Sequence, residues 1–115
     1  MPYNKFNVSS KERRTVFALT FDSLKERDRY LVLKSKEQAG EISALEMQIP
    51  FILQPDFKYG GKKERPIKFT IDFRYFDNKI GCVVYEEVKG MRTRDYILRR
   101  KMFLYQNPDK VFIET

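Results

Sequence analysis

The clearest pattern of hydrophobic and polar positions is a strict alternation over residues 67–75. Apolar side chains occupy the odd positions there, and polar or charged side chains occupy the even positions. A period of two is typical of a β-strand with one face in the core. After a turn at residues 77–81, the more apolar run from Cys82 to Lys89 predicts a second and more central strand, which Gly90 ends.

Two segments have the spacing of helices. Ser23 followed by Glu26 has the spacing of a capping box, and Gly40 is placed to stop the chain, so we expect a first helix up to about Gln38. Residues 93–105 predict a second helix that ends at Asn107-Pro108. Its apolar residues fall on one arc, which is expected to face the core: Ile97, Leu98, Met102, Leu104 and Tyr105.

The remaining segments complete an α/β pattern. Strands are expected at residues 45–53 and 111–113, and residues 56–65, with Gly60-Gly61 and several charges, predict a mobile basic loop. Residues 1–15 predict a loose basic arm, followed at residues 16–19 by a short strand or packed segment. The order α-β-β-β-α-β predicts one mixed sheet with two helices packed on it, in a single domain over residues 1–115.

Composition restricts the possible chemistry. The chain has no histidine and one cysteine, which excludes Ser-His-Asp and Cys-His catalysis and zinc sites built from histidine or thiolate. A hydrolase of this composition is expected to use a divalent cation held by oxygen ligands. The 23 Lys and Arg residues outnumber the 16 Asp and Glu residues, and a net charge of +7 favours polyanionic partners. With no membrane-length apolar run and no signal-peptide pattern, we expect a cytoplasmic protein without membrane association.

The predicted hairpin brings charged residues together. If a four-residue loop joins its strands, Asp77 pairs with Cys82, and counting back along the ladder places Asp72 opposite Glu87. Directly opposed residues point to the same face, and Lys89 shares that face because strand side chains repeat every two residues. The two carboxylates repel each other, and a bridging cation removes the repulsion and supplies a Lewis acid. We therefore expect a site for a divalent cation, in which the lysine could orient water or offset charge on a scissile phosphate.

Purely structural roles for these residues stay open. Asp72 and Glu87 could lie on a solvated face, neutralised by nearby lysine and arginine side chains, and a one-residue slip in register would exchange Glu86 for Glu87. Glu26 falls on the packed arc of the first helix, where a carboxylate needs a partner, but its place in the capping box is a sufficient structural role. Gln48 could position water or a carboxylate, or it could be an ordinary polar residue of an edge strand.

Taken together, Glu26, Asp72 and Glu87-Val88-Lys89 resemble the motifs of the PD-(D/E)XK nuclease superfamily. More narrowly, the chain resembles a small phage and prophage family long described as a domain of unknown function. The segments that carry this second resemblance extend over nearly the whole chain from residue 20: residues 21–26, 39–42, 45–48, 51–55, 71–75, 87–90 and 101–105.

The resemblance implies a restriction-endonuclease-like core and a Mg²⁺- or Mn²⁺-dependent endonuclease that hydrolyses DNA. It places the metal-binding acids at Asp72 and Glu87, helix-borne support at Glu26 and the catalytic lysine at Lys89. Ile71 stands where the strict motif has proline. Duplex or branched DNA in phage recombination, replication or processing is the implied substrate, and a homodimer is one possible active form, located in the host cytoplasm if a phage encodes it.

Basic residues cluster in two places that could contact phosphates. One group lies in the predicted loop (Lys62, Lys63 and Arg65), and the other follows the predicted hairpin (Arg92, Arg94, Arg99, Arg100 and Lys101). Lys101 falls within the apolar arc, so it could reach the carboxylates. A solvated helix face is the structural alternative for this group. Two other functions remain open: a non-catalytic nucleic-acid-binding protein on a nuclease-like scaffold, and a structural or host-interaction protein.

Overall fold

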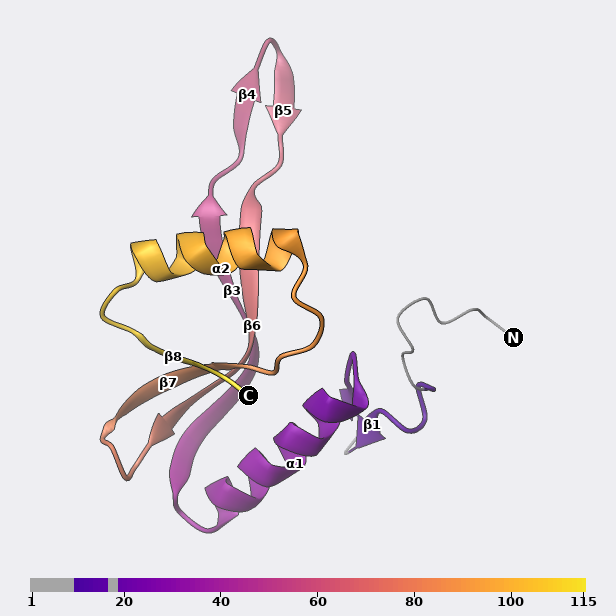
Figure 1. The fold of residues 1–115 in the computed structure, drawn as a ribbon, viewed down its shortest axis with the longest axis vertical. Helices are drawn as coiled ribbons and strands as arrows, with labels where there is room; N and C mark the ends of the chain where they lie inside the picture. The colour runs from indigo at the N-terminus through magenta and orange to yellow at the C-terminus, as the bar shows by residue number, and fades with distance from the viewer. Residues whose placement is uncertain (1–9, 17–18) are drawn as a thin grey trace.

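A mixed four-stranded sheet forms the centre of the protein, as Figure 1 shows for the computed structural model, which describes residues 10–16 and 19–115. Its strands are β3 (Ile42–Gln54), β6 (Ile67–Asp77), β7 (Cys82–Glu87) and β8 (Val111–Glu114), in the spatial order β3-β6-β7-β8. The β3–β6 and β6–β7 pairs are antiparallel, whereas β8 runs parallel to β7. Together with two helices, this sheet confirms the predicted α/β fold.

Both helices start at side chains that cap them. In α1 (Leu24–Gln38), the Ser23 hydroxyl accepts a hydrogen bond of 3.1 Å from the Glu26 N–H. Gly40 follows this helix at φ 78°, a left-handed conformation that glycine adopts without strain. In α2 (Arg94–Gln106), the Thr93 hydroxyl accepts a hydrogen bond of 3.0 Å from the Tyr96 N–H. The two helices therefore lie where the sequence predicts them.

Strand β6 connects two clusters of buried side chains. Phe73 and Tyr75 belong to a cluster that includes buried residues of α1, whereas Phe69 and Ile71 belong to a cluster that includes the buried face of α2. All four are odd-numbered positions of one strand, as the alternation predicts. Asp72 thus lies at the point where one cluster gives way to the other.

The predicted core face of α2 is wrong in part, because Met102 and Leu104 pack against the buried side chains as predicted but the other three residues of the predicted arc do not. Ile97, Leu98 and Tyr105 are 43%, 57% and 87% exposed, whereas Phe103 is completely buried. Phe103 takes the inner position because aromatic rings from three strands surround it, at centroid distances of 4.8 to 5.6 Å (Phe51, Phe69 and Phe112). Lys101, about 200° around the helix from Phe103, is exposed and does not lie on a packed face.

Residues 56–65 form a hairpin, not the predicted loop. Strand β4 (Phe57–Tyr59) pairs antiparallel with β5 (Lys62–Glu64). Between them, Gly60 and Gly61 have φ of 57° and 79°, and two successive positive φ angles make a two-residue turn that matches the twist of the strands. The hairpin projects from the sheet past α2 and forms one end of the molecule (Figure 1).

The predicted basic arm lies mostly outside the described residues, which exclude residues 1–9. Residues 11–14 form a turn, and β1 (Thr15–Val16) pairs antiparallel with β2 (Leu19–Thr20). Residues 17–18, within the predicted short strand, are also outside the described range. Among the residues that are described, no helix has the length and apolar character needed to cross a membrane.

Candidate metal site

Asp72 and Glu87 meet where β6 and β7 separate. The observed register pairs Asp77 with Cys82, which confirms the predicted hairpin. The Asp72 N–H donates a hydrogen bond of 3.0 Å to Glu87 Oε1, and the Val88 N–H donates one of 2.8 Å to Asp72 Oδ2. Strand β7 ends at Glu87, two residues before its predicted end, because the Asp72 carboxylate takes the N–H of the next residue.

Glu26 and Gln48 join these two acids. The Gln48 side-chain amide donates a hydrogen bond of 3.1 Å to Glu26 Oε1 and lies 3.4 Å from Asp72 Oδ1. Gln48 has φ 55°, a conformation that is uncommon for residues with a side chain and that often marks functional sites. We call Glu26, Asp72 and Glu87, with Gln48 between the first two, the acid cluster. It contains four of the five side chains for which the sequence predicts a catalytic role.

The pKa values of all three acids of the cluster are raised above their ordinary values. Burial, with the charges of Asp72 and Asp22, raises the pKa of Glu26 to about 7. Burial also raises the pKa of Asp72. Burial, the charge of Asp72 and a hydrogen bond with Asp72 raise the pKa of Glu87 to about 9. Negative charge is therefore unfavourable here unless a cation accompanies it.

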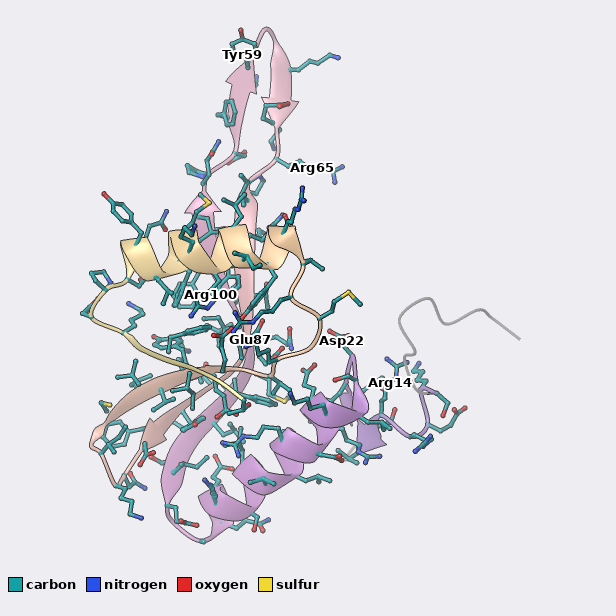
Figure 2. All side chains as sticks on the ribbon, in the orientation of Figure 1. Arg14, Asp22, Tyr59, Arg65, Glu87 and Arg100 are labelled. Carbon is teal, nitrogen blue, oxygen red and sulfur yellow. The ribbon has the colours of Figure 1, made fainter. Side chains whose placement is uncertain are left out.

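A hollow of about 350 Å³ opens beside Glu26 and Gln48. The exposed Asp22 lines it and contributes a further negative charge, which raises the pKa of Glu26 and of Asp72. Figure 2 labels this residue at the start of α1 and Glu87 near the middle of the molecule. Asp22 is not among the site residues that the sequence predicts. The sequence feature that could have indicated it is its position directly before the helix cap Ser23.

The donor atoms of the acid cluster fit a hard divalent cation. Three carboxylates and one amide supply the oxygen ligands that Mg²⁺ and Mn²⁺ prefer. Their spacing is different from that of a preformed site, since no group of three or more His, Cys, Asp or Glu side chains within the described range has metal-binding geometry. The side chains instead hydrogen-bond to each other and to backbone N–H groups. Metal binding would require them to exchange these hydrogen bonds for the ion.

Lys89 lies beyond the end of β7 and is half-buried. The Thr115 N–H donates to the Glu87 carbonyl at 3.0 Å, and the Lys89 N–H donates to the Thr115 carbonyl at 2.7 Å, so the backbone continues beside β8. The Lys25 ammonium donates to the Lys89 carbonyl at 2.7 Å. No ion pair in the part of the chain that the structure describes includes Lys89. The structure therefore does not bring this ammonium group onto the carboxylates.

Glu86 points away from the acid cluster and has a full set of partners. It is completely buried, and Arg29 donates to both of its carboxylate oxygens. The Tyr75 hydroxyl donates at 2.7 Å and the Thr115 hydroxyl at 3.0 Å. Burial alone would raise the pKa of Glu86, but Arg29 and Tyr75 bring it below its ordinary value. Glu86 is thus part of a buried ion pair, and Glu87 is the residue that contacts Asp72.

The predicted DNA-contacting residues lie in two separate regions. Lys62, Lys63 and Arg65 are exposed on and next to the β4–β5 hairpin. Near α2, Arg92 and Arg100 lie 3.5 and 3.0 Å from Glu114.

The other basic residues of α2 differ in their exposure. Arg94 and Lys101 are exposed, and Arg99 pairs with Asp95 at 2.9 Å. The carboxylates of Asp95 and Glu114 thus neutralise part of the positive charge near α2. Lys101 does not contact the acid cluster, contrary to the reach that the sequence suggested.

A family model described as a protein of unknown function, DUF1064, matches residues 5–113. The chain belongs to this family. Membership in DUF1064 confirms the predicted relationship to a family of unknown function. No curated protein and no solved structure matches the chain. The acid cluster is therefore the feature of this DUF1064 protein that indicates its chemistry.

Proposed function

We propose that the protein is a Mg²⁺- or Mn²⁺-dependent endonuclease that hydrolyses phosphodiester bonds in DNA. The observation that carries the proposal is the meeting of three acids from three separate elements, with the pKa of Glu26 raised to about 7 and that of Glu87 to about 9. Mutually repelling buried carboxylates reduce the stability of a fold, and a divalent cation removes the repulsion. Perturbed acids next to a hollow are typical of catalytic sites.

Each member of the cluster has a role in this proposal. Asp72 and Glu87 would hold the ion, with Glu26 as a further ligand. When bound, the ion supplies a Lewis acid and lowers the pKa of a coordinated water molecule. Gln48 orients the carboxylates of Glu26 and Asp72 through its amide. Lys89, two residues after Glu87, would offset the charge on the scissile phosphate.

The resemblance to the PD-(D/E)XK superfamily supports the same reaction. Glu26, Asp72 and Glu87-Val88-Lys89 occupy α1, β6 and the end of β7, in the order α1-β3-β6-β7-α2-β8 once the small hairpins are set aside. The net charge of +7 suits a DNA substrate. We further propose a role in phage DNA recombination, replication or processing, with a homodimer as the active form because one small chain offers little surface to a duplex.

A nicking assay tests this function. Supercoiled plasmid, linear duplex and four-way-junction DNA are incubated with the protein in Mg²⁺, Mn²⁺ or EDTA. Asp72→Asn, Glu87→Gln and Lys89→Met are each expected to reduce cleavage at least 100-fold. Glu41→Gln changes an exposed acid outside the cluster and serves as the matched control. Unchanged cleavage by all three variants would refute the assignment of the site.

The second candidate function is DNA binding without cleavage. The observation that favours it is the absence of a preformed metal-binding group among the described side chains. It predicts salt-sensitive DNA binding that survives the Asp72→Asn and Glu87→Gln changes, with no turnover by the unmodified protein in either metal. The plasmid assay and a binding measurement on the same samples therefore separate the two functions.

A further inference from the structure

The β4–β5 hairpin lies outside both clusters of buried side chains. All six residues of its strands are exposed, including Phe57 at 45% and Tyr59 at 79%. A hairpin that buries so little contributes little to the stability of the fold. It nevertheless extends the β3–β6 ribbon well past α2 (Figure 1). Its shape and position are therefore those of an arm that contacts something else.

The two faces of this arm differ in chemistry. The register pairs Lys58 with Lys63, and opposed residues share a face, so these two ammonium groups lie on the same side of the ribbon. Asp56 is 3.5 Å from Lys63 and belongs to that side as well. The opposite face carries the aromatic rings and the second pair of charges: Phe57, Tyr59, Lys62 and Glu64.

Positive charge is concentrated at the base of the arm. Directly opposed like charges destabilise a ribbon, and Asp56 is the carboxylate that the structure places beside the lysine pair. A groove of about 530 Å³ at this base is lined by the side chains of Lys63, Arg65 and Lys68, with Asp56 as its acidic member. Three cations against one carboxylate make an electrostatic site for a polyanion.

We propose that the β4–β5 hairpin is an arm that holds the phosphate backbone of duplex DNA through Lys58, Lys63 and the groove beside Arg65 and Lys68. This inference rests on the proposed function, because it takes the nuclease substrate as the partner. Single-strand binding sites place aromatic rings and cations in the same groove. Here the Lys58–Lys63 pair lies on the face opposite the aromatic rings, and the one lysine on the aromatic face, Lys62, is accompanied there by Glu64. This arrangement favours contact with phosphates alone and thus a duplex.

The length of the arm fits a duplex that also reaches the acid cluster. Lys63 precedes Asp72 by nine residues, which span about 30 Å at ~3.3 Å per residue in an extended chain. One turn of B-DNA measures about 34 Å. A duplex placed along the ribbon would therefore meet the arm roughly one helical turn from the phosphate at the acid cluster.

Binding of a labelled 30-base-pair duplex, measured by fluorescence anisotropy at several salt concentrations, tests the arm. All samples carry Asp72→Asn, a substitution that prevents cleavage during the measurement. Adding Lys58→Ala and Lys63→Ala is expected to weaken binding about tenfold and to reduce the slope of log affinity against log salt by about 1.8, at 0.9 per lost phosphate contact. The matched control, Lys36→Ala with Lys79→Ala, removes the same charge near the far end of α1 and is expected to leave both values unchanged.

Three outcomes would contradict the proposed role of the arm. They are an equal loss of duplex affinity for the two lysine pairs, no loss of affinity for the hairpin pair, or tighter binding of single-stranded DNA that depends on Tyr59. Plasmid nicking by the unmodified protein in Mn²⁺ is scored separately. If nicking is absent but the hairpin pair alone weakens duplex binding, the proposed reaction fails and the arm stands. If nicking occurs and the hairpin pair changes neither KM nor duplex affinity, the reaction stands and the arm is wrong.

Discussion

Glu86 and Glu87 are adjacent in β7, yet their carboxylates have opposite environments. Arg29 and Tyr75 donate hydrogen bonds to Glu86, and its pKa lies below the ordinary value despite complete burial. Glu87 instead faces Asp72, and its pKa rises to about 9. The fold thus fully compensates one buried acid and leaves its neighbour beside a second acid, which is the arrangement expected if a cation from solution completes the site.

Replacing Arg29 by methionine is predicted to destabilise the protein by about 3–5 kcal/mol, because the substitution leaves the Glu86 carboxylate buried without its ionic partner. Urea denaturation followed by circular dichroism measures the change. The double variant Arg29→Met/Glu86→Leu is expected to recover most of the loss, since it removes both charges. A small effect of the single substitution would show that Tyr75 and Thr115 suffice to stabilise the charge.

The stability of the metal-free protein is predicted to fall as the pH rises above 5. The pKa of Glu26 is raised to about 7 and that of Glu87 to about 9, so the folded state binds these protons more tightly than the unfolded chain. This contribution is complete below the ordinary pKa of about 4.5 and is lost as the pH passes through 7 and 9. Melting curves in EDTA between pH 5 and 9 measure the loss.

The same measurement on Asp72→Asn identifies the source of the pH dependence. Removing the central charge should flatten the curve and make the variant more stable than the parent protein at pH 8, by about 1–2 kcal/mol. Glu41→Gln, which lies outside the cluster, should follow the parent curve. Parallel curves for Asp72→Asn and the parent would mean that mutual repulsion of the acids does not govern stability in this range.

How far the sequence predicts this structure depends on the range of the interactions. The hairpin register follows from counting residues across a turn, and the ends of α1 follow from Ser23 and Gly40, because both are set by neighbours in the chain. The core face of α2 could not be predicted that way. Phe103 is buried because rings from three different strands surround it, and the pairing of those strands is not visible in the spacing of residues within the helix.

The candidate site shows the same division. Asp72 and Glu87 are predicted to meet by counting across the hairpin, and Glu26 is predicted from its place on the packed arc of the first helix and from the family resemblance. The link between Glu26 and Asp72 is Gln48, which adopts φ 55° inside a strand and bonds to Glu26. Nothing in the residues around position 48 indicates a left-handed backbone. Lys89 was expected to continue β7, and the Asp72 carboxylate prevents this by binding the Val88 N–H.

Adding Mn²⁺ is predicted to reverse the pH-dependent loss of stability. An ion that binds the folded state alone stabilises it by about 2.7 kcal/mol at 100 times its Kd. Melting temperatures at pH 8 should therefore rise with Mn²⁺ concentration and return when EDTA removes the ion. Glu87→Gln should reduce the rise strongly, whereas the hairpin change Lys58→Ala should not alter it. An equal rise in the Glu87→Gln variant would place the ion elsewhere.

Two positive-φ positions in β3 provide a matched pair of substitutions. Ala44 and Gln48 have φ of 54° and 55°, where glycine avoids a steric penalty of roughly 1 kcal/mol that other residues carry. Ala44→Gly is predicted to raise the free energy of unfolding by about that amount and to leave plasmid nicking unchanged. This variant shows how much the removal of backbone strain alone contributes to the free energy of unfolding.

Gln48→Gly gives the same relief but removes the amide that contacts Glu26 and Asp72 at 3.1 and 3.4 Å. Losing these hydrogen bonds costs about 1 kcal/mol, so the free energy of unfolding should stay close to that of the parent protein. Nicking should nevertheless fall about tenfold or more, because the two carboxylates lose the group that orients them. If Gln48→Gly instead matches Ala44→Gly in both stability and nicking, the left-handed residue is a feature of strand geometry and has no part in the site.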